Sequence, residues 1–316
     1  MMTNANDISQ RQNAESVIQY QAAAKTLYRK AEKLFYAQVW FGVAFPVLFA
    51  IVNLVLPGWS VSRLRREHIA GWFALYGFVM LLVDEFLIDR AQQGCKRKAA
   101  TAQEMFDVEL FHLPWNTTKV QERLDPSDVA ELAAKSLPTV QSASLLRDWY
   151  PPVVGDVPLE IGRLICQRTN LWWDSKLRRW YATGLFTFAA ILVCLAVISA
   201  KVFVLNLDRL LISLITVGPA FRWAIREGNR HRSLADRLDR LCSRAKELQV
   251  AVLESRLSTE QARQASRELQ DAIFDHRSTA PIGISWLYRI FRKKFEAGMR
   301  VNAEEVVLEY RAKQRK

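Results

Sequence analysis

The sequence predicts an all-α membrane protein, in which four transmembrane helices form two hairpins on either side of a polar middle. The prediction rests on four long apolar runs, at residues 35–56, 69–88, 181–204 and 205–220. At a rise of 1.5 Å per residue, each run is about long enough to cross the ~30 Å hydrocarbon core of a bilayer. A backbone in lipid must satisfy its own hydrogen bonds, so the runs are expected to be helices.

The composition indicates two environments within one chain. The 316 residues carry a net charge of +12, and the mean hydropathy of -0.03 averages the apolar runs with basic, polar segments. In membrane proteins Lys and Arg gather on the cytoplasmic side, where they face anionic headgroups. The same charge would attract an anionic ligand or a nucleic acid, so charge alone does not identify the partner.

Cysteine spacing gives no sign of a metal site. The four cysteines lie far apart, and none has a histidine at metal-ligand spacing; they are Cys95, Cys166, Cys194 and Cys242. We therefore expect reduced thiols, with no metal and no cofactor. About thirty polar residues precede the first apolar run, which is predicted to be an anchor and not a cleavable signal peptide.

The basic residues also predict the orientation. Clusters of Lys and Arg precede the first run, follow the second, precede the third and follow the fourth. All four clusters fall on one side if both termini do, and the positive-inside rule makes that side the cytoplasm. The short loop between the first two runs disagrees, since it holds Arg63, Arg65 and Arg66, but it is outvoted.

The chain divides into five segments on this basis. An N-terminal amphipathic helix (1–34) leads into the first transmembrane hairpin (35–90). A soluble cytoplasmic insertion (91–178), which its prolines are expected to break into short helices and loops, precedes the second transmembrane hairpin (179–222). A cytoplasmic helical hairpin and a basic tail complete the chain (223–316).

Two helix starts can be placed by their capping residues. Asp125 precedes Pro126, a typical first helical residue, and Ser258 with Gln261 fits a capping box. Before that box, apolar residues recur at steps of four and three from Leu234, which is an a/d seam. With under three clean heptads, we expect the two helices to pack on each other as an antiparallel hairpin, in preference to an intermolecular coiled coil.

Short motifs along the whole chain form a recognisable pattern. They are Arg11-Gln12-Asn13, Met105-Phe106-Asp107, Leu113-Pro114-Trp115-Asn116, Cys166-Gln167-Arg168-Thr169-Asn170, Trp173-Asp174, Leu177-Arg178-Arg179-Trp180-Tyr181, and Leu269-Gln270-Asp271-Ala272-Ile273-Phe274 with Arg277. Together they resemble the SMODS-associating four-transmembrane effector family. The resemblance covers nearly the whole chain, and the motifs have the same order relative to the apolar runs.

The resemblance implies a bacterial antiphage effector at the cell inner membrane. In such systems a partner nucleotidyltransferase senses phage and makes a cyclic oligonucleotide, and the effector then compromises the membrane and kills or arrests the cell. The expected partners are therefore the lipid bilayer, a cyclic oligonucleotide as activating ligand and further copies of the chain, with no nucleic acid. The resemblance gives no binding residues.

No enzyme signature is found in the sequence. It has no phosphate-binding Gly-rich loop, no nucleophile grouped with a base in a family context and no paired-carboxylate site. The protein is therefore predicted not to be an enzyme.

Binding a cyclic oligonucleotide requires guanidinium groups for its phosphates and flat surfaces for its bases. Residues 163–173 offer both kinds of group, and residues 115–116 would supply a second wall. The predicted ligand-binding residues are Arg163, Gln167, Arg168, Asn170, Trp115 and Asn116. Alternatively, the tryptophans of residues 172–180 form an interfacial belt, with arginines extending to the headgroups.

Polar residues inside the apolar runs are the candidates for a pore lining. They are Arg209, Ser213 and Thr216, which share one face of the fourth run, and Asp84 and Glu85 near the inner end of the second. The stripe in the fourth run could instead allow close helix packing, and the acidic pair could sit at the membrane interface.

Two functional hypotheses follow. In the first, a cyclic-oligonucleotide signal causes the protein to oligomerise and disrupt the inner membrane. In the second, the protein is a membrane-anchored scaffold or sensor that recruits a soluble partner through its basic C-terminal helices.

Overall fold

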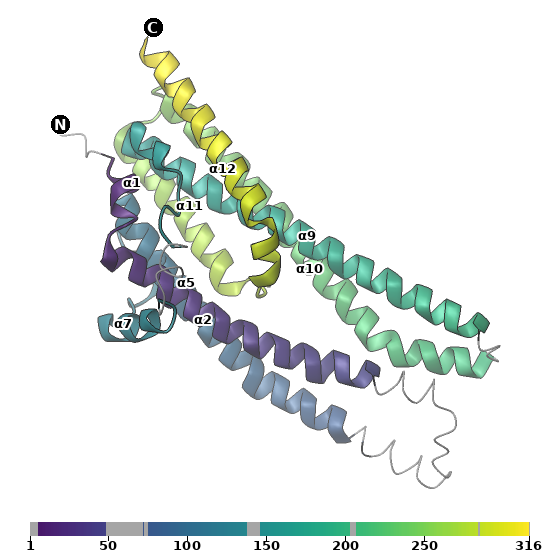
Figure 1. Cartoon of the computed structure of the whole chain (residues 1–316). Coiled ribbons are helices and arrows are strands. Elements are labelled where there is room, and N and C mark those ends of the chain that lie inside the picture. The colour runs from purple at the N-terminus through teal and green to yellow at the C-terminus, as the bar shows by residue number, and fades with distance from the viewer. Residues whose placement is uncertain are drawn as a thin grey trace. The chain divides into compact units, whose positions relative to one another are not determined.

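The computed structural model describes residues 6–48, 72, 75–137, 146–202, 207–283 and 285–315. Within these ranges every regular element is helical, which confirms the all-α prediction for this part of the chain (Figure 1). The elements are α1 (Ile8–Arg11), α2 (Glu15–Val39), η1 (Trp40–Ala44), η2 (Asp84–Ile88), α5 (Asp89–Phe111), α6 (Thr117–Val120), α7 (Pro126–Ala134), η3 (Pro152–Asp156), α9 (Leu159–Val202), α10 (Leu207–Leu253), α11 (Thr259–Thr279) and α12 (Ser285–Gln314).

Both predicted helix starts are confirmed. The Asp125 side chain accepts a hydrogen bond from the backbone N–H of Ser127 at the start of α7. At the start of α11, the Ser258 hydroxyl accepts from the backbone N–H of Gln261, and the Gln261 side chain accepts from the backbone N–H of Ser258. These bonds satisfy N–H groups that the first turn of a helix leaves without partners.

The prediction of short helices throughout the insertion is wrong at both of its ends. The insertion was expected at 91–178, but α5 continues to Phe111 and α9 begins at Leu159. The reason lies in the positions of the prolines, which in this segment fall only between Pro114 and Pro158. Helix breakers are therefore confined to the middle of the insertion, where α6, α7 and η3 are short.

The chain forms two compact units. Unit 1 comprises Met1–Ala31, Gln93–Leu177 and Leu234–Lys316, and unit 2 comprises Glu32–Gln92 and Arg178–Ser233. The helices α2, α5, α9 and α10 each contribute residues to both units.

Unit 1 has a large apolar core. Its main cluster joins α1, α5, η3, the start of α9 and the end of α12, and contains Phe106, Phe111 and Tyr150. A second cluster contains the predicted seam, in which Leu238 and Leu248 of α10 lie with Leu269 of α11. The seam therefore packs within the chain, as a hairpin whose helices are joined by residues 254–258 (Figure 1).

Unit 2 has the opposite distribution of side chains. Its buried hydrophobic side chains, among the described residues, are five alanines and one leucine: Ala182, Ala189, Leu192, Ala196, Ala220 and Ala224. Large side chains such as Phe78, Leu87 and Ile198 are instead more than half exposed. Small side chains let helices approach closely, while the large ones cover the outside of the unit.

One helix among the described residues, Leu159–Ile198, is long and apolar enough to cross a membrane. The predicted runs 35–56 and 69–88 fall partly on residues 49–71, 73 and 74, and the third and fourth runs meet at 203–206, all outside the described residues. The four-span topology and the cytoplasmic placement of both termini therefore stay predictions.

Candidate functional site

A network of buried polar side chains lies between α5 and α11 in unit 1. Glu104 and Asp107 lie one turn apart on α5 and are 0% and 1% exposed. Arg267 and Arg277 of α11 pair with them: Arg267 Nη2 lies 2.6 Å from Glu104 Oε1, and Arg277 Nη1 lies 2.6 Å from Asp107 Oδ2. Gln270, which is fully buried between the two pairs, donates to both carboxylates.

Asp107 connects this network to three further segments. Its Oδ1 accepts a hydrogen bond of 2.8 Å from the hydroxyl of Tyr150, and that hydroxyl accepts one of 2.7 Å from Asn170 Nδ2 on α9. The backbone of Tyr150 is held in turn by Gln12, whose side-chain amide bonds both its N–H and its carbonyl. One carboxylate thus ties together four segments that are distant in sequence.

Arg267 makes the corresponding connection at the other end of the network. Its guanidinium also bonds Asp271 at 2.9 Å and the carbonyl of Pro114 at 3.1 Å. Asn116 donates to the same Asp271 at 2.9 Å and caps α6 through the N–H groups of residues 118 and 119. Five of the seven motifs that carried the family resemblance therefore contribute residues to this network.

Burial governs the electrostatics of this network. Burial raises the pKa of Glu104 above its ordinary value of 4.5, although Arg267 and Gln270 partly offset the effect. Burial likewise raises the pKa of the Cys166 thiol and the Tyr150 hydroxyl, so both groups are neutral at pH 7. The arrangement holds segments in register, and it presents no activated nucleophile.

Four of the predicted ligand-binding residues are engaged inside the protein. Asn170 and Asn116 belong to the network. Gln167 is fully buried and exchanges hydrogen bonds with Ser266 and Gln270 of α11. Arg163 is 3% exposed and donates to the carbonyl of Phe111, while its Nη1 has no hydrogen-bond partner among the described residues.

Trp115 and Arg168 occupy different surroundings. The Trp115 indole donates to the carbonyl of Gln121, and the Arg123 guanidinium lies 4.8 Å from its ring. Arg168 is half-buried on α9 and bonds Gln249 at 3.3 Å. The six predicted residues therefore do not form a single site.

Arg168 does border a cavity between α9 and α12. The cavity has a volume of about 360 Å³. Two elements supply all of its lining, which is Arg168, Thr169, Trp172, Ala297, Gly298, Met299, Val301, Asn302 and Glu305. Gly298 faces the Trp172 ring so closely that a Cβ atom there would lie 2.8 Å from it, so a glycine is needed beside the indole. The cavity combines a guanidinium, an aromatic face and polar groups.

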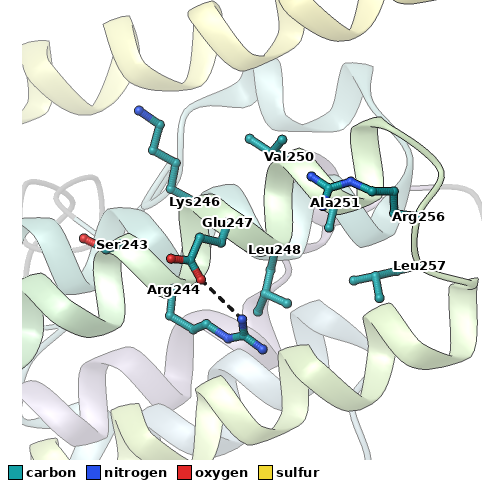
Figure 2. A pocket seen from close by; sticks show the side chains of 9 residues that line it. All are labelled: Ser243, Arg244, Lys246, Glu247, Leu248, Val250, Ala251, Arg256 and Leu257. Atoms are coloured by element: carbon teal, nitrogen blue, oxygen red, sulfur yellow. Dashed lines mark hydrogen bonds and ion pairs between the residues drawn. The ribbon is translucent and has the colours of Figure 1, made fainter.

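A larger cavity of about 650 Å³ lies at the end of α10 (Figure 2). Its lining includes Arg244, Lys246 and Arg256, but Figure 2 shows Lys246 and Arg244 pointing away from each other. Arg244 and Arg256 are also paired, with Glu247 and Glu254. These cations do not converge on one anion.

The predicted pore-lining residues can be placed only in part. The side chains of Arg209, Ser213 and Thr216 lie outside the described residues. Asp84 and Glu85 begin η2, a π-helical turn, and the buried Oδ1 of Asp84 has no hydrogen-bond partner among the described residues. Such widened turns are frequent at functional positions.

Sequence reasoning missed a polar cluster buried inside unit 2. Arg178 and His231 are 7% and 3% exposed, and Arg178 Nη1 lies 3.3 Å from His231 Nδ1. The Tyr181 ring lies 4.3 Å from the His231 ring, and Glu32, 7% exposed, accepts a hydrogen bond from Tyr36. Arg178 and Tyr181 belong to a motif noted above, but its distance in sequence from His231 gives no sign that they meet.

Comparison with known proteins gives one family and one relative. The model of the SMODS-associating 4TM effector domain matches residues 6–306. A protein of Bacillus cereus (strain VD146), described as a probable CBASS effector molecule, is 23% identical over 292 residues, which is 92% of this chain and 95% of that protein. No solved structure matches the chain.

Proposed function

The chain belongs to the SMODS-associating 4TM effector family, and we propose that it is an antiphage CBASS effector that acts by disrupting the bacterial inner membrane. The proposed action is not catalytic. It is instead a change in how the apolar segments of unit 2 are assembled in lipid.

The single observation that carries this proposal is the exposed apolar surface of unit 2. Ile191, Leu195 and Ile198 of α9 are at least half exposed, and so are Phe78, Leu81 and Leu87. Exposing a large apolar side chain to water costs about 1.5–3 kcal/mol relative to burial, so a surface of many such side chains requires lipid. We propose that residues 35–90 and 179–222 are the four-helix membrane region of an inner-membrane protein with both termini in the cytoplasm.

The proposed activating ligand is a cyclic oligonucleotide made by a partner nucleotidyltransferase. Of the residues predicted to bind it, Arg168 borders the cavity between α9 and α12, where the Trp172 indole offers a surface for a base. Asn302 and Glu305 line the same cavity and supply hydrogen-bonding groups for a base edge. We place the ligand there, between α9 and α12.

Activation requires that the ligand favour one of two arrangements. We propose that binding between α9 and α12 changes how these helices pack, and that the helices shared by both units carry the change into unit 2. Assembly of several copies would then bring polar groups such as Asp84 together around a path for ions.

A direct test is to express the chain with and without its cognate nucleotidyltransferase and to follow membrane potential with a potential-sensitive dye. The proposal predicts depolarisation that begins with growth arrest. Growth arrest at unchanged potential would contradict it, and would favour the scaffold that recruits a soluble partner through its basic C-terminal helices.

The ligand site is tested by titrating the detergent-solubilised protein with candidate cyclic oligonucleotides in a calorimeter. Arg168→Ala removes a charge-assisted hydrogen bond worth about 1.5–3 kcal/mol, so affinity should fall about tenfold or more. Arg244→Ala, which removes a guanidinium from the other cavity, is the matched control. Equal affinities of both variants would remove Arg168 from the site.

A further inference from the structure

The exposed side chains of α12 show a pattern that the proposed function does not use. Among the described residues, all the exposed large hydrophobic side chains of unit 1 lie on this one helix: Trp286, Ile290, Val301 and Leu308. Trp286 and Ile290 are 47% and 63% exposed. A soluble unit that otherwise covers its apolar groups therefore leaves one helix face uncovered.

Charge divides this face into two halves. Exposed Arg289, Lys293 and Lys294 surround Ile290 in the first half, where Glu296 is exposed as well. In the second half, exposed Glu304, Glu305 and Glu309 lie around Leu308, and Arg300, Arg311 and Lys313 match them in number. An aromatic and aliphatic strip flanked by lysine and arginine is the composition of helices that lie at the surface of an anionic bilayer. The second half carries as many basic as acidic residues, so it lacks this attraction.

Contacts with α9 show which half of α12 lies toward the membrane. The rings of Tyr288 and Phe295 each lie 5.3 Å from the ring of Trp173 on α9. The apolar run of α9 begins at Tyr181, eight residues later in the same helix. The basic half of α12 is thus attached to α9 just before the segment proposed to enter lipid.

The second half of α12 is attached near the start of α9. Val306 and Val307 belong to the same apolar cluster as Leu159, the first residue of α9, and Arg311 pairs with Asp156 at 2.9 Å. Leu159 lies 22 residues before Tyr181 in the same helix. The basic first half of α12 therefore contacts the part of α9 that is nearer in sequence to the apolar run.

We propose that the first half of α12 is a binding surface for anionic phospholipid headgroups, in which Trp286 and Ile290 insert between headgroups and Arg289, Lys293 and Lys294 contact phosphates. This inference rests on the proposed membrane location of unit 2. It adds a second attachment of unit 1 to the bilayer, which depends on lipid charge. A second copy of the chain and an acidic soluble protein are the competing occupants of this face.

The test uses two matched positions on the same helix. Ile290 and Leu308 are 63% and 64% exposed and differ in their charged neighbours. Each is changed to cysteine and labelled with an environment-sensitive fluorophore, in a full-length chain in which Cys95, Cys194 and Cys242 are serine and the buried Cys166 is kept. The labelled protein is placed in nanodiscs of phosphatidylcholine, with and without phosphatidylglycerol.

The inference predicts a blue-shifted emission at position 290, quenched by spin-labelled lipid, in nanodiscs that contain phosphatidylglycerol and much less in those that do not. Position 308 should stay aqueous in both. A blue shift at both positions in either lipid would indicate pairing with a second copy and overturn the inference. So would an aqueous signal at position 290 that shifts only when a soluble acidic protein is added.

A label on native Cys194, which is exposed in the apolar run of α9, separates failure of the inference from failure of the proposed function. If Cys194 lies in hydrocarbon and position 290 is aqueous, the inference is wrong and the membrane location stands. If Cys194 is also aqueous, both are wrong.

Neutral variants test the role of charge. Each basic residue near an anionic surface changes binding about fivefold, so the triple variant Arg289→Gln, Lys293→Gln and Lys294→Gln should weaken insertion at position 290 about a hundredfold. The control removes three cations that line the cavity at the end of α10, by Arg244→Gln, Lys246→Gln and Arg256→Gln. It should leave the emission of the label at position 290 unchanged. If both triple variants weaken insertion at position 290 equally, the first half of α12 does not recognise anionic headgroups.

Discussion

Units 1 and 2 place their apolar side chains in opposite ways. Unit 1 buries aromatic and branched residues such as Phe106, Phe111 and Ile165, and exposes large ones only on α12 within the described residues. Unit 2 buries alanines and exposes residues such as Phe78 and Leu195. Since the hydrophobic effect acts only where water is the solvent, the two distributions are those expected if, as proposed, water surrounds unit 1 and lipid surrounds unit 2.

The polar interiors of the units differ as well. Unit 1 contains a continuous network in which each carboxylate has several partners, centred on Asp107. Unit 2 has a small cluster around Arg178 and His231. The network of unit 1 fixes the positions of many segments. The cluster of unit 2 is small, so close contact between small side chains is the main determinant of packing there.

The largest expected effect concerns the network of unit 1. Asp107→Ala leaves Arg277 without its carboxylate and Tyr150 without its acceptor, and removal of one partner of a buried ion pair costs about 3–5 kcal/mol. The free energy of unfolding, measured by chemical denaturation in detergent, should fall by about that amount. Asp275→Ala breaks the exposed ion pair with Lys119 and should cost at most about 1 kcal/mol. Similar losses in the two variants would mean that the network does not hold unit 1 together.

A second prediction concerns the small side chains of unit 2. Ala189 is 2% exposed on α9, so Ala189→Leu forces extra methyl groups into a packed interface at a cost of about 1–3 kcal/mol. The neighbouring Ala190 is exposed, and Ala190→Leu should be tolerated in a lipid environment. Thermal unfolding of both variants in nanodiscs measures the difference. If Ala190→Leu is the more harmful change, the lipid-facing side of α9 has been assigned wrongly.

The smallest expected effect is a pH dependence that belongs to unit 1. Burial raises the pKa of Glu104 above 4.5, so above that pH the folded protein holds a proton that the unfolded chain has released. The free energy of unfolding should therefore decline as pH rises from about 4.5 toward the raised pKa. Glu104→Gln cannot ionise and should show a weaker decline in pH-dependent denaturation. A steeper decline in the variant would mean that the ion pair with Arg267 outweighs burial.

Local patterns predicted the helices well, because their signals lie within a few residues of one another. The caps at Asp125 and Ser258 and the seam from Leu234 each involve groups of one or two turns, and all are seen in the structure. The short helices expected throughout residues 91–178 were wrong, because the prolines were counted without regard to where they cluster.

The candidate site could not be predicted in the same way. Gln167 and Asn170 were assigned to a ligand because amides and arginines near tryptophans suit a nucleotide. Instead, Gln167 bonds Gln270 of α11, and Asn170 bonds Tyr150, which lies before η3. Nothing in the spacing of Asp107, Tyr150 and Arg277 indicates that they meet, since their contact depends on the packing of α5 and α11. The motifs identified residues of the buried network, but they did not predict which residues would contact one another.

The central claim, that water surrounds unit 1 and lipid surrounds unit 2, is tested most directly by photolabelling. The protein in nanodiscs is exposed to a lipid-soluble diazirine, and the labelled peptides are mapped by mass spectrometry. We predict labels on residues of both segments of unit 2, 32–92 and 178–233, and in unit 1 on the first half of α12 alone. Labels confined to residues 181–198, or spread evenly over the α5 and α11 segments of unit 1, would contradict the account.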